Sequence, residues 1–215
     1  MPRYPTVLFD LDGTLLDSIP LILESFHHTL RAFAFPPRPD AELLRGVGTP
    51  LATQLALWAR DAAELDAMVA AYREYNLRHH DDRVRAFPGV VETVSALRAA
   101  GVRIGVVTSK GRSTAFRGLR AAGLEDAVEA AVCAEDVTRA KPHREPVDRA
   151  IALLGAVAEA TLFIGDSLHD LHAGRAAAVP TGAALWGPFP ADELAAGQPT
   201  HWLDSPEQIL RLVLA

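Results

Sequence analysis

The chain of 215 residues is poor in cysteine and in positive charge, and it has no long hydrophobic run. Its one cysteine, Cys133, excludes an intrachain disulfide. With 21 Lys and Arg against 27 Asp and Glu, and no basic run, it lacks the charge pattern of a nucleic-acid-binding protein. No apolar stretch reaches membrane-spanning length. The N-terminal apolar stretch is interrupted by Asp10, which leaves it too short for the hydrophobic region of a signal peptide. We therefore expect a cytoplasmic protein with no nucleic-acid or membrane partner.

Lysine is also scarce: only Lys110 and Lys141 occur, and every other basic residue is arginine. A lysine in this chain therefore needs a specific reason. Lys141 lies in a loop before a predicted helix, among residues that we interpret below as a site. We expect Lys110 only to contribute to the local positive field or to cap a helix.

Five short apolar segments predict the strands of a buried sheet. They lack polar alternation, as expected where both faces of a sheet are covered. The segments are Thr6–Phe9, Val102–Thr108, Ala130–Cys133, Thr161–Ile164 and Thr181–Leu185. Helical spacing occurs between them, at Val90–Ala100, Ser113–Ala122 and Glu145–Leu154. Alternating strands and helices predict an α/β fold with a doubly wound parallel sheet, a Rossmann-like core.

The segment 16–85 breaks this alternation and predicts a second unit. It contains no strand-like run, and Ile19–Phe33 and Ala62–Leu77 have helical spacing. Thr49 followed by Pro50 predicts another helix, with Thr49 as its N-cap. The segment is too long for a simple crossover. We therefore predict an α/β core formed by residues 1–15 and 86–215, with 16–85 inserted as an α-helical cap.

Four carboxylates follow two of the predicted strands. Asp10 and Asp12 come directly after the first strand, and Asp166 and Asp170 follow the strand at Thr161–Ile164. In open parallel sheets, ligands bind beyond the carboxyl ends of the strands. Four like charges at one edge would repel one another, so a divalent cation is expected there. Oxygen ligands favour Mg²⁺, which also accepts phosphate oxygens.

Hydroxyl groups and a lysine are predicted at the same edge. Thr108 and Ser109 follow the second core strand, and Lys141 lies in the next loop region. This combination suits a phosphoryl group: Asp10 can attack phosphorus, Thr108 and Ser109 can donate hydrogen bonds, and Lys141 can neutralise the equatorial oxygens together with Mg²⁺.

The motifs DLDGT, VVTSK, KPHREP and GDSLHD occur in this order along the chain. With them, essentially the whole chain resembles the haloacid dehalogenase superfamily of phosphohydrolases that carry a helical cap. The resemblance implies that Asp10 is the nucleophile and forms an aspartyl phosphate. It implies that Asp12 protonates the leaving group and then activates water. Thr108 would bind the phosphate, and Lys141 would bridge phosphate and nucleophile.

The resemblance also implies a metal site. Mg²⁺ would be held by Asp10, by the backbone carbonyl of Asp12 and by Asp166. Asp170 would not bind the metal directly but would stabilise either the metal site or Lys141.

Several branches of this superfamily do not fit the sequence. Dehalogenases lack an acid at the position of Asp12, and phosphonate-cleaving members need a cap lysine, which 16–85 does not contain. Sugar-phosphate mutases carry a cap histidine at the position where Ile22 stands here. A hydrolase of small phosphate compounds is what remains.

Two kinds of hydrolase match different parts of the predicted cap. Asp17-Ser18-Ile19-Pro20 resembles phosphoglycolate phosphatases, which is our first interpretation. The alternative is an inorganic pyrophosphatase of the same superfamily, and its small bacterial members are similar over a longer stretch. That similarity covers Ser25–Leu30 and the residues Tyr72, Arg73, Asn76, His80 and Asp81.

Both substrates are small anions, so the cap is expected to present positive or hydrogen-bonding groups. We select the segment Arg45–Thr49, with the sequence RGVGT, as the specificity loop, and Arg45 and Gly46 as its substrate-binding residues. Its two glycines allow the backbone to approach a ligand closely.

A non-enzymatic interpretation remains open beside the hydrolase. Receiver domains of response regulators also combine acids at strand ends, a hydroxyl residue and a lysine in an α/β fold. The Asp10-x-Asp12 spacing and the inserted cap distinguish this chain from them. A catalytically inactive scaffold is a further alternative, although every motif residue is present. We expect a monomer or a weak homodimer.

Overall fold

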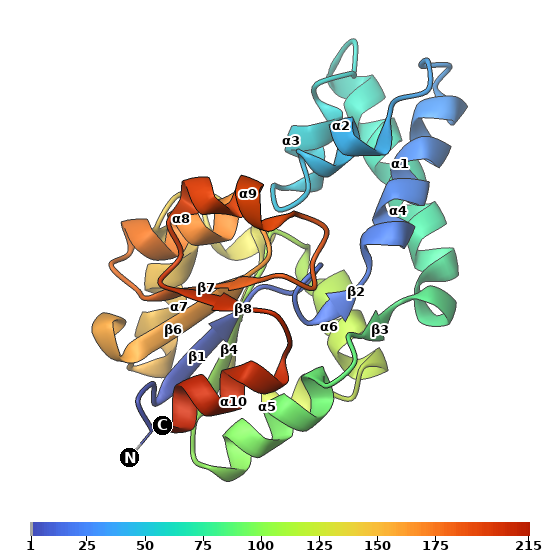
Figure 1. Ribbon diagram of the computed structural model, residues 1–215. Helices are drawn as coiled ribbons and strands as arrows, with labels where there is room; N and C mark the ends of the chain where they lie inside the picture. Colours follow the sequence, from blue (N-terminus) through green and yellow to red (C-terminus); the bar gives the residue numbers. More distant parts are fainter. Residues whose placement is uncertain (1) are drawn as a thin grey trace.

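A computed structural model describes residues 2–215 and contains a six-stranded sheet with every neighbouring pair parallel (Figure 1). The strand order is β5-β4-β1-β6-β7-β8. The strands are β1 (Thr6–Phe9), β4 (Arg103–Val107), β5 (Ala130–Val132), β6 (Thr161–Gly165), β7 (Thr181–Ala184) and β8 (His201–Leu203). The predicted doubly wound α/β fold is confirmed, and β1 lies in the interior of the sheet between β4 and β6.

Helices cover both faces of this sheet. They are α5 (Val90–Ala99), α6 (Arg112–Ala121), α7 (Glu145–Leu154), α8 (Leu168–Ala176), α9 (Ala191–Leu194) and α10 (Glu207–Leu214). Successive side chains of a strand point to opposite faces. Val7 and Phe9 therefore pack in the cluster that includes side chains of α5, α6 and α10, whereas Leu8 packs with α7 and α8. All three side chains are at most 1% exposed, so β1 is a rigid base for the residues that follow it.

The four remaining helices lie to one side of the sheet (Figure 1). They are α1 (Ile19–Ala32), α2 (Asp40–Leu44), α3 (Leu51–Leu55) and α4 (Ala62–Arg83). Their buried side chains, among them Phe26, Leu55 and Met68, form an apolar cluster of their own. This separate core supports the predicted helical cap at 16–85, whose boundaries remain a prediction.

Two expectations within this segment are wrong. A short antiparallel pair, β2 (Leu16–Asp17) with β3 (Arg85–Ala86), lies where the chain leaves and re-enters the core, although no strand was expected there. Thr49 is not an N-cap: α3 begins one residue later, with Pro50 at the N-cap position. The Thr49 hydroxyl instead donates to the Gly46 carbonyl at 2.7 Å, which closes the preceding turn.

The last strand and the last helix, β8 and α10, are not predicted from the sequence. The helix α4 continues to Arg83 rather than ending at Leu77. Within residues 2–215, no helix combines the length and the apolarity that crossing a membrane would require.

Candidate active site

The carboxyl ends of β1, β4 and β6 bring the predicted site residues together. Asp10 follows β1, Thr108 follows β4, and Asp166 follows β6. Carboxylate oxygens of Asp10, Asp166 and Asp170 all lie within 4.8 Å of one another. All three side chains are buried. The structure therefore assembles a compact group of acids at the edge of the sheet where ligands bind.

Lys141 lies at the base of this group. Its ammonium donates to Asp10 Oδ1 at 2.7 Å, to Asp170 Oδ1 at 2.6 Å and to the Val107 carbonyl at 3.2 Å. Burial lowers the pKa of the Lys141 ammonium, but the charges of Asp10 and Asp170 outweigh it and raise this pKa above its ordinary value. Lys141 is therefore a permanent cation that fixes the orientation of Asp10.

One lysine does not balance three buried carboxylates. Burial and the charge of Asp170 raise the pKa of Asp10 to about 7, although Lys141 opposes the shift. The same causes raise the pKa of Asp166 well above its ordinary value. A divalent cation would remove this repulsion, and the all-oxygen donor set fits Mg²⁺.

The hydrogen bonds distinguish the acids that could hold such an ion. Asp170 is occupied by protein donors: Oδ1 accepts from Lys141, and Oδ2 accepts from the Ser167 hydroxyl at 2.5 Å and its backbone N–H at 3.2 Å. Asp166 accepts from Thr14 Oγ1 at 2.7 Å through Oδ1. Asp10 and Asp166 are thus the better ligands, and Asp170 orients Lys141.

The turn after β1 requires glycine next to this site. Gly13 has a φ of +87°, which side chains rarely adopt, and a Cβ there would lie 2.5 Å from Asp166 Oδ2. Trp186 holds the turn from outside, because its ring N–H donates to the Thr14 carbonyl at 2.9 Å. The backbone therefore approaches the carboxylate too closely for any side chain.

A Gly13→Ala variant is expected to lose at least about tenfold in apparent Mg²⁺ affinity, because the added methyl group would displace Asp166, a predicted ligand of the ion. Gly101→Ala is the matched control: its φ is +79°, but a Cβ there meets nothing within 4 Å. The control is expected to lose about 1 kcal/mol of stability through backbone strain and to keep its Mg²⁺ dependence. Metal titrations of activity and thermal melts would separate the two, and equal Mg²⁺ curves would contradict the argument.

Asp12 is not part of the acid group and is held by two donors of its own. Lys110 Nζ donates to its two oxygens at 2.8 and 3.1 Å, and Ser18 Oγ donates to Oδ1 at 2.5 Å. The expectation that Lys110 only adds to the field or caps a helix is therefore wrong, since it pairs directly with Asp12. The scarcity of lysine was the signal that could have identified it.

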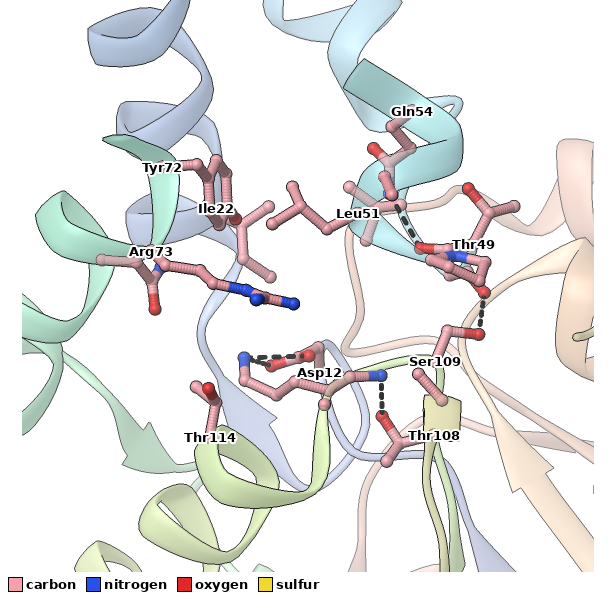
Figure 2. A pocket seen from close by; sticks show the side chains of 18 of the residues that line it. Asp12, Ile22, Thr49, Leu51, Gln54, Tyr72, Arg73, Thr108, Ser109 and Thr114 are labelled. Carbon is pink, nitrogen blue, oxygen red and sulfur yellow. Dashed lines mark hydrogen bonds and ion pairs between the residues drawn. The ribbon is translucent and has the colours of Figure 1, made fainter. Parts of the chain in front are cut away.

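A cavity of about 490 Å³ lies between the sheet edge and the cap helices (Figure 2). Asp10, Asp12, Thr108 and Ser109 line its floor. The Ser109 hydroxyl donates to the Gly48 carbonyl of the cap at 2.6 Å, and Thr108 Oγ1 accepts from the Lys110 backbone N–H at 3.1 Å. The motif residues of the core therefore face a partly open cavity large enough for a small substrate.

The predicted specificity loop reaches the cavity with its second half only. Among residues 2–215, the lining of the cavity includes Val47, Gly48 and Thr49 but neither Arg45 nor Gly46. Arg45 is exposed, and a Cβ on Gly46 would lie 2.7 Å from Gln54 Oε1. The glycine at 46 thus serves packing inside the cap.

The cap wall of the cavity comes mainly from α1, α3 and α4. Ile22, Phe26 and Leu51 make much of it apolar, whereas Arg73 extends from α4 into the space above Asp12 (Figure 2). From the sequence, Arg73 is part of the resemblance to pyrophosphatases and has no predicted role of its own. Its position on α4, four residues before the cavity-lining Leu77, is the signal that places both on one helix face.

Comparisons with known proteins agree with this geometry. The family model of haloacid dehalogenase-like hydrolases matches residues 7–184. The pyrophosphatase PpaX of Anoxybacillus flavithermus is 36% identical over 97% of this chain and 96% of its own length, and PpaX of Halalkalibacterium halodurans gives the same values. Among solved structures, a protein of Bacteroides fragilis assigned as a haloacid dehalogenase-like hydrolase is 28% identical, with a TM-score of 0.89 over 96% of this chain and 99% of its own. A Lactobacillus plantarum protein assigned as a phosphoglycolate phosphatase is 27% identical, with a TM-score of 0.86 over 97% and 99%.

Proposed function

We propose that this chain, which belongs to the haloacid dehalogenase-like hydrolases, is a Mg²⁺-dependent phosphohydrolase whose substrate is inorganic pyrophosphate. The observation that carries the substrate is the identity of 36% with PpaX pyrophosphatases over nearly the full length of both chains, cap included. The cavity supports it, because its volume of about 490 Å³ suits a small ligand and both Arg73 and Lys110 line it.

2-Phosphoglycolate, our first interpretation of the sequence, is the second candidate substrate. The full-length likeness to the Lactobacillus plantarum protein favours it, at 27% identity. Like pyrophosphate, it is small and carries a second anionic group beside the phosphoryl group that is transferred.

The arrangement of the core residues supports a two-step reaction. Asp10 attacks phosphorus through a carboxylate oxygen, and the bond from phosphorus to the leaving oxygen breaks as Asp12 donates a proton to that oxygen. Asp12 must carry that proton when substrate is bound, so one of its oxygens has to give up the contact with Lys110. Asp12, now a base, takes a proton from water, whose oxygen attacks the aspartyl phosphate. Asp10 leaves as a carboxylate and orthophosphate is released.

The neighbouring side chains prepare this sequence of steps. Lys141 holds Asp10 at 2.7 Å and places a positive charge beside the reacting oxygens. Thr108 and Ser109 are the hydroxyl donors for the transferred group. Ser109 bonds to Gly48 here, so its hydroxyl must exchange that partner for phosphate.

The fit of the buried acids to a hard cation supports Mg²⁺ as the cofactor. Asp10 and Asp166 would hold it, together with the backbone carbonyl of Asp12. When bound, the ion stabilises the negative charge that develops on the phosphoryl oxygens. We place the reaction in the cytoplasm and expect a monomer or a weak homodimer, acting on small phosphate compounds rather than on nucleic acid or membranes.

Release of orthophosphate from pyrophosphate, 2-phosphoglycolate and p-nitrophenyl phosphate tests the proposal. With Mg²⁺ we expect kcat/KM for pyrophosphate to exceed that for the aryl phosphate by at least about 100-fold, because of these two compounds only pyrophosphate carries a second anionic group for the cavity cations. Excess EDTA should abolish all turnover, and added Mg²⁺ should restore it.

The outcomes separate the candidates. A preference for 2-phosphoglycolate would replace the substrate but keep the reaction. Full turnover in EDTA would refute the metal. Absence of turnover on every compound would favour the non-enzymatic alternatives, a phosphoacceptor switch or an inactive scaffold.

A further inference from the structure

The ionisable residues that line the cavity are nearly all paired. Lys110 is bonded to Asp12, and Asp10 is bonded to Lys141 beneath the floor. Glu135, at the rim, accepts the Arg112 backbone N–H at 3.0 and 3.2 Å. Within residues 2–215, Arg73 is the one cation of the lining that has no ion pair or hydrogen bond through its side chain. The cavity therefore contains one uncommitted positive charge.

The other arginines of α4 show that this is a property of position 73. Arg78 pairs with Glu74 at 2.6 Å, and Arg83 pairs with Glu24 of α1. Both lie away from the cavity lining described for residues 2–215. Arg73 instead projects toward Asp12, between the cap wall and the sheet edge (Figure 2). An arginine left without a carboxylate in a partly apolar cavity suits an anionic ligand rather than a structural pair.

We propose that Arg73 is a substrate-binding residue that holds the anionic group of the leaving portion, which is the second phosphoryl group of pyrophosphate. This inference rests on the proposed function. Lys141 lies at the Asp10 end of the site, where it neutralises the transferred phosphoryl group. A second phosphoryl group must extend from there past Asp12 toward the cap, since the core lies behind Asp10.

The chemistry of the guanidinium group agrees with this position. It is planar, always charged, and presents parallel N–H donors that match two oxygens of one phosphoryl group. The Arg73 side chain is exposed at the cavity, so an incoming anion can reach it without displacing a protein partner. Arg73 would thereby select substrates whose leaving group is charged.

The experiment compares Arg73→Gln and Arg73→Lys with Arg78→Gln, a control on the same helix that removes an exposed arginine outside the cavity. We expect Arg73→Gln to reduce kcat/KM for pyrophosphate by about 100-fold and that for p-nitrophenyl phosphate by less than about threefold. Arg73→Lys keeps the charge but not the paired donors, so it should lose about tenfold on pyrophosphate. The control should match the wild type on both compounds.

Calorimetry with methylenediphosphonate, a pyrophosphate analogue that is not hydrolysed, gives a second readout. Binding should weaken by about 100-fold in Arg73→Gln, because one charge-assisted bidentate contact is lost. Thermal melts should be unchanged, since the side chain has no partner to lose in the described structure. Equal losses on pyrophosphate and p-nitrophenyl phosphate, or no loss on either, would overturn the assignment.

The 2-phosphoglycolate arm separates this proposal from the proposed function. One outcome is that the wild type prefers 2-phosphoglycolate while Arg73→Gln selectively loses that activity. This result would confirm that Arg73 binds the anionic leaving group and would refute pyrophosphate as the substrate. If the wild type hydrolyses only p-nitrophenyl phosphate, with neither charged leaving group accepted, the role of Arg73 falls as well.

Discussion

An Asp10→Asn variant is expected to lose at least about 10³-fold in kcat on pyrophosphate, because an amide oxygen does not attack phosphorus as a carboxylate does. The substitution keeps the shape of a side chain that is 4% exposed and follows a fully buried strand. The Lys141 ammonium also keeps Asp170 as its carboxylate partner at 2.6 Å. We therefore expect the variant to fold.

Phosphate release and thermal melts, measured on the same preparations, check this result. Asp192→Asn is the matched control, since Asp192 is an exposed residue of α9 far from the acid group in sequence. It should behave as the wild type in both assays. An Asp10→Asn enzyme that kept a tenth of the activity would remove Asp10 from the role of nucleophile and leave the mechanism without its first step.

The strands that carry the site could be predicted because their sequences are unambiguous. Val7, Leu8 and Phe9 form an apolar run without alternation, and such a run is typical of a strand covered on both faces. The acids follow it and its neighbour immediately. Since parallel strands end at one edge, topology alone brings Asp10 and Asp166 together.

The elements that the sequence analysis missed lack that signal. The strands β2 and β3 have two residues each, which is too short for any periodicity. The strand β8 (His201–Leu203) lies at the edge of the sheet, and its Trp202 is 43% exposed. Its sequence therefore lacks the continuous apolar pattern that predicts a buried strand. The end of α4 has the polar sequence HHDDR, which shows no apolar periodicity. In the structure, tertiary contacts such as the ion pair of Asp81 with Arg117 of α6 hold this end in place.

Side-chain partners in the site depend on tertiary placement that spacing does not reveal. Lys110 reaches Asp12 only because β4 lies beside β1 and both chains turn toward the cap. The glycines of the predicted specificity loop are sites of close approach, but both come close to protein side chains, and of the two only Gly48 also lines the cavity. Gly46 packs against Gln54, and a Cβ on Gly48 would lie 3.0 Å from His169 Cδ2 of the core. A close approach to protein cannot be distinguished from one to a ligand by sequence alone.

Lys141→Arg is expected to lose at least about 100-fold in kcat although it conserves the charge, because a planar guanidinium is too wide for the place of the ammonium. Lys141 is 2% exposed, and its single nitrogen bonds Asp10, Asp170 and the Val107 carbonyl at once. The larger group would have to displace at least one of the two carboxylates. Displacement of Asp10 misaligns the nucleophile directly.

Lys110→Arg provides the internal comparison. Its pair with Asp12 is less enclosed, with side chains 12% and 15% exposed, and it lies at the cavity, where a longer side chain can adjust. We expect a loss of less than about tenfold there. Lys141→Ala should also lower the free energy of unfolding by about 3–5 kcal/mol, since it leaves buried carboxylates without their counter-charge. Steady-state kinetics and denaturant melts of the three variants under one buffer decide the matter: equal, small effects of arginine at both positions would mean that Lys141 is only one source of positive charge and does not position Asp10.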